Sequence, residues 1–458
     1  MRHAWILLVL VLVLTGCTVG PDYVRPEIQS PEEYQQPVME GESIANLPWF
    51  ELFADSVLVN LIDQTLRENR DLRVAIARID EAAASVGIVR ADLFPRVDYG
   101  GSGTLDGNSI DNWKTNSSAS GFLGISWQLD LWGRVRRSEE AALQTVLARE
   151  ENARGVMISL VAGVANTYLL LLDLDNRLII SEETVKIRRD NFDIISARYD
   201  GGSVTAVDLN QSLIQLAEAE AAVQVFTRLR AQTENALSVL MGRPPMRIPR
   251  GKGLRRRITV PQMPTGLPSA LIERRPDILA AERELHAQTA RIGAAQALKF
   301  PQFDLTGSVG GALSDPSLGF FDIGAQVFGP IFNAGQNQSR VEVEEARTWQ
   351  LIAIYEQTIL NAWREVEDAL VATHTYEAEY AARRRQVDAA DAASELAWVR
   401  YDGGLTSYLE ILETQRAWFN AQLKASETLQ LWLNSIVNLY SALGGGWHEG
   451  APPAETGG

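Results

Sequence analysis

Four segments of the chain alternate hydrophobic and polar residues with a period of two. In the stretch GFLGISWQLDLW, every odd-numbered residue from Leu123 to Leu131 is apolar, and the residues between them are glycine, serine, glutamine or aspartate. The segments around Val97, Phe303 and Ile323 follow the same alternation. A period of two gives a β-strand one apolar and one polar face. We therefore expect strands over residues 94–107, 119–132, 300–313 and 321–332.

The residue types of these strands favour a membrane sheet, although a soluble antiparallel sheet over a core shows the same alternation. The polar face consists of glycine, serine, threonine, glutamine and aspartate with hardly a lysine, which is typical of the wall of a water-filled lumen. Aromatic residues near the strand ends suit the interfacial girdles of a membrane β-barrel. These residues are Trp127, Trp132, Phe320 and Phe321.

Two long stretches, 135–199 and 337–401, contain no proline and little glycine. Apolar residues recur three or four positions apart between residues 157 and 178 and between residues 352 and 376. This spacing predicts long helices with a packing seam, and abundant alanine lets neighbouring helices approach closely. About 65 helical residues span about 100 Å at 1.5 Å per residue. Shorter helices are expected over 71–93, 205–241, 277–299 and 407–443.

The chain repeats itself after about 200 residues. The sequence RYDGG stands at residues 198–202 and again at 400–404, each time at the end of a long helix, and LFPRVDYGGSG corresponds to the later KFPQFDLTGSV. A repeat of this length exceeds a solenoid unit and indicates a duplicated domain. We expect a first repeat over residues 56–242, a linker over 243–270, a second repeat over 271–443 and a C-terminal tail over 444–458.

Four strands in one chain are too few to close a barrel. An open sheet in a bilayer leaves unsatisfied N–H and C=O groups on two edges, each costing several kcal/mol. Two copies would supply eight strands around an interior filled by side chains, whereas the polar strand face requires water. We therefore expect a mainly α fold with a membrane β-barrel: a homotrimer whose twelve-stranded β-barrel is continued by an α-helical barrel of twelve columns.

The N-terminus predicts export and attachment to a membrane. An apolar run over residues 6–14 is much shorter than the ~20 residues of a spanning helix and suits a signal peptide over 1–16. LTGC ends at Cys17, the only cysteine, and resembles the bacterial lipoprotein box, in which this cysteine is acylated. A chance cysteine in an ordinary signal peptide is the alternative. By the same resemblance, Thr18 in place of aspartate favours the outer membrane.

Later segments contain no run of 18 uninterrupted apolar residues, so we expect strands to make any membrane span.

The formal net charge of −16 disfavours nucleic acid as a partner, and the basic stretch at 247–257, with its proline and glycines, is interpreted as a solvated connector. Motifs of hydrolases, metalloproteases and nucleotide-binding proteins are absent, so we expect no enzyme, no cofactor and no metal site. The four histidines are scattered: His3, His286, His374 and His448.

Several motifs together resemble one protein family. GCTVGPDYVRP follows the signal peptide, LPWFELFADSVLVNLIDQTLRENRDL precedes the first repeat's strands, ERRPDI opens the second repeat, and RYDGG occurs twice. With these motifs the chain resembles TolC-type outer-membrane efflux ducts of the lipid-anchored OprM/NodT kind, also called outer membrane factors. The resemblance implies an outer-membrane β-barrel, a long periplasmic α-barrel, a lipid anchor and equatorial segment over 17–55, and an equatorial belt completed by 242–269 and 444–458.

The resemblance also implies a function. Such a chain forms the outer-membrane exit duct of a tripartite efflux system, which receives small molecules from a periplasmic adaptor (membrane fusion) protein and an inner-membrane transporter, here expected to be proton-driven. The outer-membrane duct of a type I protein secretion system is the alternative, because the tunnel itself does not choose its cargo. A passive porin would consist mostly of strands, whereas helices dominate here. The sequence does not identify the cargo.

The two RYDGG turns are the candidate docking tips. Glycine adopts the left-handed conformation that ends a helix, so each glycine pair releases the chain into a turn at the end of the tunnel far from the strands. Small residues beside the turns suit close packing of an adaptor, and a plain helical hairpin is the alternative. The candidate docking residues are Gly201, Gly202, Ser203, Thr205, Gly403, Gly404, Thr406 and Ser407.

A candidate periplasmic gate follows the second turn. Leu409, Glu410 and Glu413 share one helical flank, and in a trimer the two glutamates would form acidic rings that attract cations. Glu413 facing solvent is the alternative. The resemblance implies that acidic and apolar rings close the entrance here and that Tyr401 bonds to Asp208 as a latch. Thr406 stands where some relatives carry an arginine in this latch.

Overall fold

The computed structural model describes residues 18–36, 43–48, 55–108, 114–251, 253, 268–312 and 315–445. The predicted signal peptide, Cys17 and most of the predicted C-terminal tail lie outside the described residues. The chain divides into two compact units, each of which contains parts of both sequence repeats. The sheet unit comprises Met1–Gln29, Ala75–Asn152 and Asp277–Thr358, and the tip unit comprises Ser30–Val74, Ala153–Pro276 and Ile359–Gly458.

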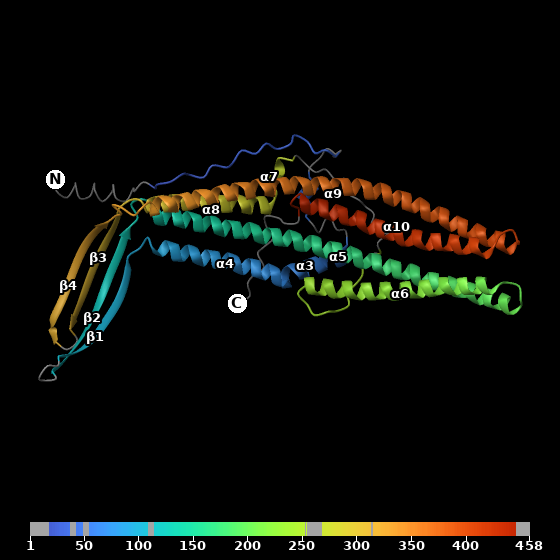
Figure 1. Cartoon of the computed structure of the whole chain (residues 1–458), viewed down its shortest axis with the longest axis horizontal. Helices are drawn as coiled ribbons and strands as arrows, with labels where there is room; N and C mark the ends of the chain where they lie inside the picture. Colours follow the sequence, from blue (N-terminus) through green and yellow to red (C-terminus); the bar gives the residue numbers. More distant parts are fainter. Residues whose placement is uncertain are drawn as a thin grey trace. The chain divides into compact units, whose positions relative to one another are not determined.

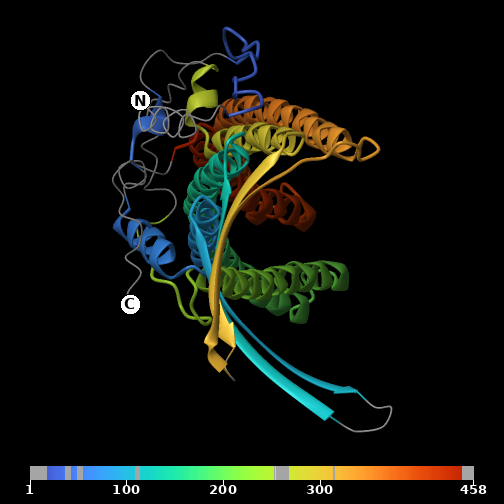
Figure 2. The ribbon, with the colours of Figure 1, turned by 90° about the vertical axis from the view of Figure 1, so that its left-hand side faces the viewer.

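The sheet unit contains one antiparallel sheet with its strands in chain order (Figure 1). The pairing of β2 with β3 joins the two repeats, with Leu123 opposite Val309. Figure 2 shows that the strands are curved, as twisted strands generally are. The four predicted strands are present, with ends shifted by one to six residues: β1 is Arg96–Asn108, β2 is Lys114–Leu129, β3 is Gln302–Ala312 and β4 is Asp315–Phe328. The largest corrections are the starts of β2 and β4, which lie five and six residues before the predicted 119 and 321.

The hydrogen bonds at the end of β2 explain why the predicted strand 119–132 extends too far. The Asp130 carboxylate accepts the N–H groups of Val135 and Arg136 at 3.0 Å each. These are orphan donors in the first turn of α5 (Arg134–Asp200). Asp130 therefore serves the start of the helix, and the strand ends at Leu129 rather than at 132.

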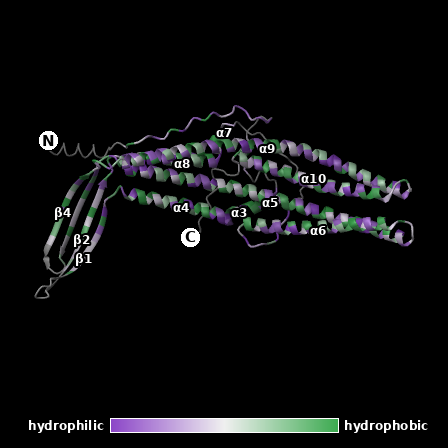
Figure 3. Ribbon diagram, viewed as in Figure 1, coloured by the Kyte–Doolittle hydropathy of each residue, from purple (hydrophilic) through white to green (hydrophobic). Residues whose placement is uncertain are grey.

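The two faces of the sheet differ as the alternation predicts, and Figure 3 shows the hydropathy of the residues along the strands. On the apolar face, Tyr99 is 89% exposed and Ile323 is 87% exposed. On the polar face, hydroxyl groups bond across strands, as in the pair Ser102 and Ser120 at 2.8 Å. A soluble sheet would bury its apolar face on a core. The exposed apolar face of this sheet therefore favours the membrane interpretation over the soluble one.

The register corrects the expected position of one aromatic residue. Phe320 lies opposite Gly310, and Asp322 lies opposite Ser308, so Phe320 shares the polar face with Asp322. It does not belong to an outward-facing aromatic girdle, as the sequence analysis expected. Phe321 lies on the apolar face and is 80% exposed.

Small residues pack the helices of the sheet unit closely. These helices are most of α4 (Arg70–Ala91), α8 (Pro276–Ala297) and the first parts of α5 and α9 (Gln336–Asp402). One buried cluster consists only of alanines from α5 and α8, because a methyl side chain allows a short distance between helix axes. The members of this cluster are Ala141, Ala287 and Ala290.

The tip unit has a larger apolar core. It joins α3 (Ser56–Glu68), α6 (Ala206–Leu240) and α10 (Tyr408–Ala442) to the second parts of α5 and α9. The predicted seams are confirmed, since most of their tip-unit residues are buried. The buried seam residues of the tip unit are Leu160, Val164, Leu171, Leu174 and Leu178 on α5, and Ile359, Ala362, Val366, Ala369 and Thr373 on α9.

Among the described helices, α5 is long and apolar enough to cross a membrane by length and composition alone. Half of its most apolar 18-residue stretch is buried inside the protein, and a core helix of a soluble domain passes the same test. Val161, Val164 and Ala165 lie within the tip-unit core at 2% exposure or less. Their apolar character is therefore explained by this core.

The ERRPDI motif connects segments that are distant in the sequence. Arg275, which follows the short helix α7 (Ala270–Arg274), donates to the carbonyl oxygen of Ala442 at 3.0 Å and to Glu365 at 2.8 Å. The carbonyl of Ala442, at the end of α10, has no acceptor role within the helix. Arg275 therefore both caps α10 and joins it to α9.

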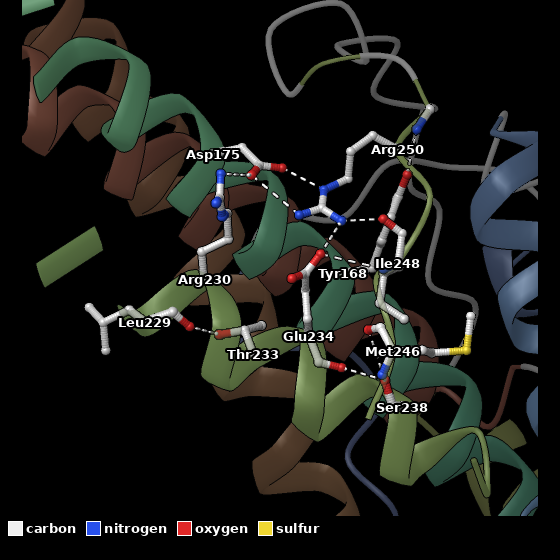
Figure 4. Close-up of polar contacts among 11 residues, drawn as sticks. Tyr168, Asp175, Leu229, Arg230, Thr233, Glu234, Ser238, Met246, Ile248 and Arg250 are labelled. Atoms are coloured by element: carbon white, nitrogen blue, oxygen red, sulfur yellow. Dashed lines mark hydrogen bonds and ion pairs between the residues drawn. The ribbon is translucent and has the colours of Figure 1, made fainter. Parts of the chain in front are cut away.

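The basic connector is partly a structural clamp, which corrects its interpretation as solvated. Arg250 bonds to Asp175 of α5 at 2.6 Å and to Glu234 of α6 at 2.8 Å (Figure 4). Burial alone would lower the pKa of Arg250, but these two carboxylates raise it. The next residue, Gly251, donates its N–H to the Tyr168 hydroxyl at 2.8 Å. The start of the linker is thus fixed to α5 and α6.

Candidate functional site

The two RYDGG segments end their helices with the same backbone hydrogen bonds. In the first turn, the N–H of Ser203 donates to the oxygen of Arg198 at 2.8 Å, and the N–H of Gly202 donates to the oxygen of Tyr199 at 2.9 Å. The corresponding groups 202 residues later bond at the same distances. This pattern is the Schellman motif, which satisfies carbonyl groups at a helix end.

Only the second glycine of each pair is left-handed. Gly202 has a φ of +70° and Gly404 a φ of +71°, where a side chain is strained. The N–H groups of Gly201 and Gly403 instead continue the helical pattern, each bonding four residues back at 3.1 Å. The left-handed requirement therefore falls on Gly202 and Gly404.

A small apolar cluster joins the two turns into one tip. Residues from the ends of α5 and α9 meet residues from the starts of α6 and α10. Because the cluster draws on all four helices, a movement of one hairpin must disturb the other. Its buried members are Ile195, Ala397, Tyr408, Ile411 and Leu412, with Val204, Leu209, Trp398 and Tyr401 partly buried beside them.

The docking residues lie at the accessible end of this tip. Gly201, Gly202, Ser203, Thr205, Gly403, Gly404 and Ser407 are exposed, and Thr406 is half-buried. Leu405, which the sequence analysis did not select, is 75% exposed. This exposed leucine, directly after the second glycine pair, gives the tip an apolar contact point.

Asp208 has a local structural role in the single chain. Its carboxylate accepts the N–H of Thr205 at 3.0 Å and the Thr205 hydroxyl proton at 2.7 Å, and Thr205 in turn accepts the N–H of Asp208. This reciprocal pair is a capping box that begins α6. Among the hydrogen bonds of the described residues, none joins Asp208 to Tyr401, so the latch stays a prediction.

Tyr401 is held by an arginine and by aromatic neighbours. The Arg198 guanidinium lies 5.4 Å from the centre of its ring, and the ring of Tyr408 lies 5.6 Å away. Burial, with smaller contributions from Tyr401 and Asp208, raises the pKa of Tyr408 to about 12. Tyr408 therefore stays neutral at physiological pH and belongs to the core of the tip. The sequence analysis missed it because it considered only the polar flank of α10.

The two gate glutamates each have a partner in the single chain. Glu410 accepts the hydroxyl proton of Thr406 and lies 3.6 Å from Arg400. Glu413 accepts from Arg416 at 2.7 and 2.8 Å. These arginines reduce the negative charge that the predicted acidic rings would carry.

The repeat identifies an apolar gate candidate that sequence reasoning missed. Val207 occupies on α6 the position that Leu409 occupies on α10, 202 residues later. Val207 is 63% exposed and Leu409 is 52% exposed. The alignment of the two RYDGG turns would have found it.

The segment that follows Cys17 is fixed to the sheet unit. Gly20 has a φ of +103°, and a Cβ atom there would lie 2.3 Å from the Cα atom of Gly293 in α8, so two glycine backbones are in close contact. Asp22 pairs with the nearly buried Arg137 of α5 at 2.6 Å. A lipid on Cys17 would therefore be attached close to a rigid element.

The GPDYVR motif continues this attachment along α8. Arg25 makes a two-point ion pair with Glu282, at 2.8 and 2.6 Å. The Tyr23 ring stacks on His286, with ring centres 4.6 Å apart, and His286 bonds to Glu140 at 3.1 Å. His286 thus has a structural role, and the described residues contain no cluster of three or more potential metal ligands.

Comparisons with known proteins agree over nearly the whole chain. A family model described as outer membrane efflux protein matches residues 61–243 and 267–445. The chain is 36% identical to the outer membrane protein OprJ of Pseudomonas aeruginosa over 460 residues, which cover 97% of this chain and 96% of OprJ. It is 32% identical to the cation efflux system protein CusC of Escherichia coli over 449 residues, 96% of this chain and 97% of CusC. The open-state crystal structure of the MtrE outer membrane channel of Neisseria gonorrhoeae matches with a TM-score of 0.85 and 30% identity, over 94% of this chain and 98% of MtrE.

Proposed function

Because the chain belongs to the outer membrane efflux protein family, we propose that it is the outer-membrane exit duct of a tripartite efflux system. It carries small molecules from the periplasm to the outside of the cell. The family is one of channels rather than enzymes, which agrees with the expectation that the chain has no catalytic site.

The exposed apolar face of the open four-stranded sheet carries this proposal. Val97, Tyr99, Phe321 and Ile323 are each at least 67% exposed. Burying such side chains in lipid is worth about 1.5–3 kcal/mol each. The polar face on the other side requires water, so the sheet suits a bilayer only as part of a barrel wall.

The two outer strands of the sheet show that several copies of the chain must share one barrel. Strands β1 and β4 are the two outer strands, and their outer N–H and C=O groups need partners inside a bilayer. Pairing β1 of one copy with β4 of the next satisfies both edges. Three copies make a twelve-stranded barrel with a lumen, so we infer a homotrimer in contact with outer-membrane lipid.

Cys17 is the proposed lipid attachment site. The fixed segment that follows it, with Gly20 against Gly293 and Asp22 against Arg137, supports this role. A lipid attached at residue 17 would reach the bilayer beside the strands that its own subunit contributes to the barrel. A single lipid anchors a chain without spanning the membrane.

The tip is the proposed gate and docking site. Exposed glycine turns suit contact with a periplasmic adaptor, and the cluster shared by both hairpins suits a coupled opening of the gate. Leu409, Glu410 and Glu413 would line the closed entrance, with Tyr401 and Asp208 as the latch. The adaptor would deliver cargo from an inner-membrane transporter, which we expect to be proton-driven.

The experiment is to purify the full-length protein from outer membranes, to determine its mass in detergent, and to measure single-channel currents in planar bilayers. The proposal predicts a complex of three chains that conducts ions. A stable single chain that conducts ions alone would contradict it. Deletion of the gene, followed by susceptibility tests with dyes, antibiotics and metal salts, would then identify the cargo.

A further inference from the structure

One row of the sheet breaks the alternation of polar and apolar residues. Phe122 and Phe320 lie on the polar face, 45% and 48% exposed. The register places them in a single row across all four strands, in the order Gly100, Phe122, Gly310, Phe320. Phe328, the last residue of β4, is a further large apolar residue of this face.

The two rings lie over the glycines of the same row. A Cβ atom on Gly100 would lie 2.5 Å from two atoms of the Phe122 ring. A Cβ atom on Gly310 would lie 2.8 Å from Cζ of Phe320. Each ring therefore covers the backbone of a neighbouring strand, while about half of each side chain remains exposed. Packing of aromatic rings over strand glycines stabilises sheets, but it does not require the rings to be on the polar side.

A row of carboxylates lies directly beside the row of rings. Asp98, Gly124, Ser308 and Asp322 face one another across the four strands, two residues along from the aromatic row and thus about 7 Å away. Asp322 accepts from Ser308, and Asp98 bonds to Arg96 at 2.9 Å.

The middle of the polar face is acidic. Across positions 96–105, 118–129, 302–312 and 319–328 this face carries three aspartates, 98, 304 and 322, against Arg96. Nearer the β1–β2 hairpin, the register adds Asp106 and Lys114 to the same face. In the proposed trimer, the two adjacent rows would supply six rings and six carboxylates at neighbouring levels of the lumen wall. An aromatic ring next to negative charge attracts an organic cation by stacking, by cation–π contact and by direct charge.

We propose that Phe122 and Phe320, with Asp98 and Asp322, form a weak binding belt in the barrel lumen for organic cations that carry an aromatic ring. This inference rests on the proposed trimeric duct, because only a closed barrel turns the polar face into a lumen wall. The belt provides a last contact for such a cation after the periplasmic tunnel. Anions would be repelled, and non-aromatic cations would meet only the carboxylates.

The test uses single-channel currents of the reconstituted full-length trimer with two probes on the external side. Benzyltrimethylammonium carries a ring, and butyltrimethylammonium has the same charge without one. The proposal predicts that the ring-bearing cation blocks the wild-type current at a lower concentration. In the double variant Phe122→Leu/Phe320→Leu, its half-blocking concentration rises about two- to fivefold, whereas that of butyltrimethylammonium is unchanged.

Matched variants separate the belt from general effects on the barrel. Phe321→Leu changes the neighbouring residue on the opposite face and leaves both probes unaffected. Phe122→Tyr/Phe320→Tyr keeps the rings and keeps the block. Asp98→Asn/Asp322→Asn weakens the block by both cations more than Asp304→Asn does.

The outcomes distinguish a failure of the proposed belt from a failure of the proposed duct. If the leucine double variant does not assemble, the single variants Phe122→Leu and Phe320→Leu each give a smaller shift in the same direction. Conducting trimers with the same half-blocking concentration in wild-type and leucine variants overturn the belt and leave the duct intact. A wild-type protein that forms no conducting trimer overturns both.

Discussion

Replacing Gly202 by alanine tests whether the glycine turns fix the tip. Gly202 has a φ of +70°, and a Cβ atom there would meet nothing within 4 Å. The cost of alanine is therefore backbone strain alone, about 1 kcal/mol. That strain weakens the closing hydrogen bond from Ser203 to Arg198, which is 2.8 Å long.

Hydrogen exchange measures this effect at the turn itself. A loss of about 1 kcal/mol raises the exchange rate of the Ser203 amide about fivefold, if exchange proceeds by local opening. Mass spectrometry on peptides that cover residues 195–210 would detect this change in the purified protein.

Gly201→Ala is the matched control. Its Cβ atom would lie 3.5 Å from the carbonyl oxygen of Ala197, an ordinary contact, and its φ is not left-handed. Alanine favours helix over glycine, so exchange at Ser203 stays the same or slows. Equal acceleration in both variants would refute the assignment of the left-handed position to Gly202. The pair Gly403→Ala and Gly404→Ala repeats the test at the second turn.

Three further predictions concern the gate, the linker and pH. If Leu409 and Glu413 close the entrance, the double variant Leu409→Ala/Glu413→Ala raises single-channel conductance several-fold. The control Glu395→Ala, on the exposed side of α9, leaves the conductance unchanged. Unchanged conductance in the double variant would show that Leu409 and Glu413 do not form the gate. Arg250→Ala leaves Asp175 and Glu234 without their shared partner and lowers the free energy of unfolding by about 2 kcal/mol. The control Arg247→Ala, at an exposed position, does not. Equal denaturant midpoints for the wild type and Arg250→Ala would show that the clamp does not stabilise the protein. Burial raises the pKa of Asp173 despite Arg177 and Ser426, so the folded state binds its proton more readily than the unfolded state. Its contribution to stability is then greatest below the ordinary aspartate pKa and falls as pH rises through the raised value, and Asp173→Asn should remove this pH dependence from thermal unfolding.

The sequence predicted the elements with strong periodicity most successfully. Long helices and alternating strands follow from patterns that extend over many residues. The ends of α5 and α9 were therefore found within one residue, and those of the four strands within six. The strand end at Asp130 was missed because its side chain serves the following helix, and alternation alone does not show this. The short α7 has too few residues to show a period.

The tip was predicted in position but not in its contacts. Glycine pairs mark a turn, yet only backbone geometry shows that Gly202 and Gly404 carry the left-handed conformation. Glu413 was selected by charge and spacing and Asp208 by the family resemblance. Their partners Arg416 and Thr205 follow from local helix geometry that could have been examined. The clamp at Arg250 was missed because its partners lie 75 and 16 residues away, and no local pattern predicts such contacts.

Cysteine cross-linking between β1 and β4 tests the closure of the barrel most directly. Within one chain these strands are the two outer strands of the sheet, three strand spacings or about 14 Å apart. A disulfide requires Cα atoms about 4.4–6.8 Å apart, so a β1–β4 bond forms only between copies. Tyr99→Cys is combined in turn with Gly319→Cys, Phe321→Cys, Ile323→Cys and Ala325→Cys, which scan the register along one face of β4.

The proposed duct predicts that at least one of these pairs gives covalent dimers and trimers on a non-reducing gel, with nothing larger than a trimer. None of the five single cysteine variants alone should form them. The absence of cross-links at every register, or a series that stops at dimers or continues past trimers, would contradict a barrel shared by three chains.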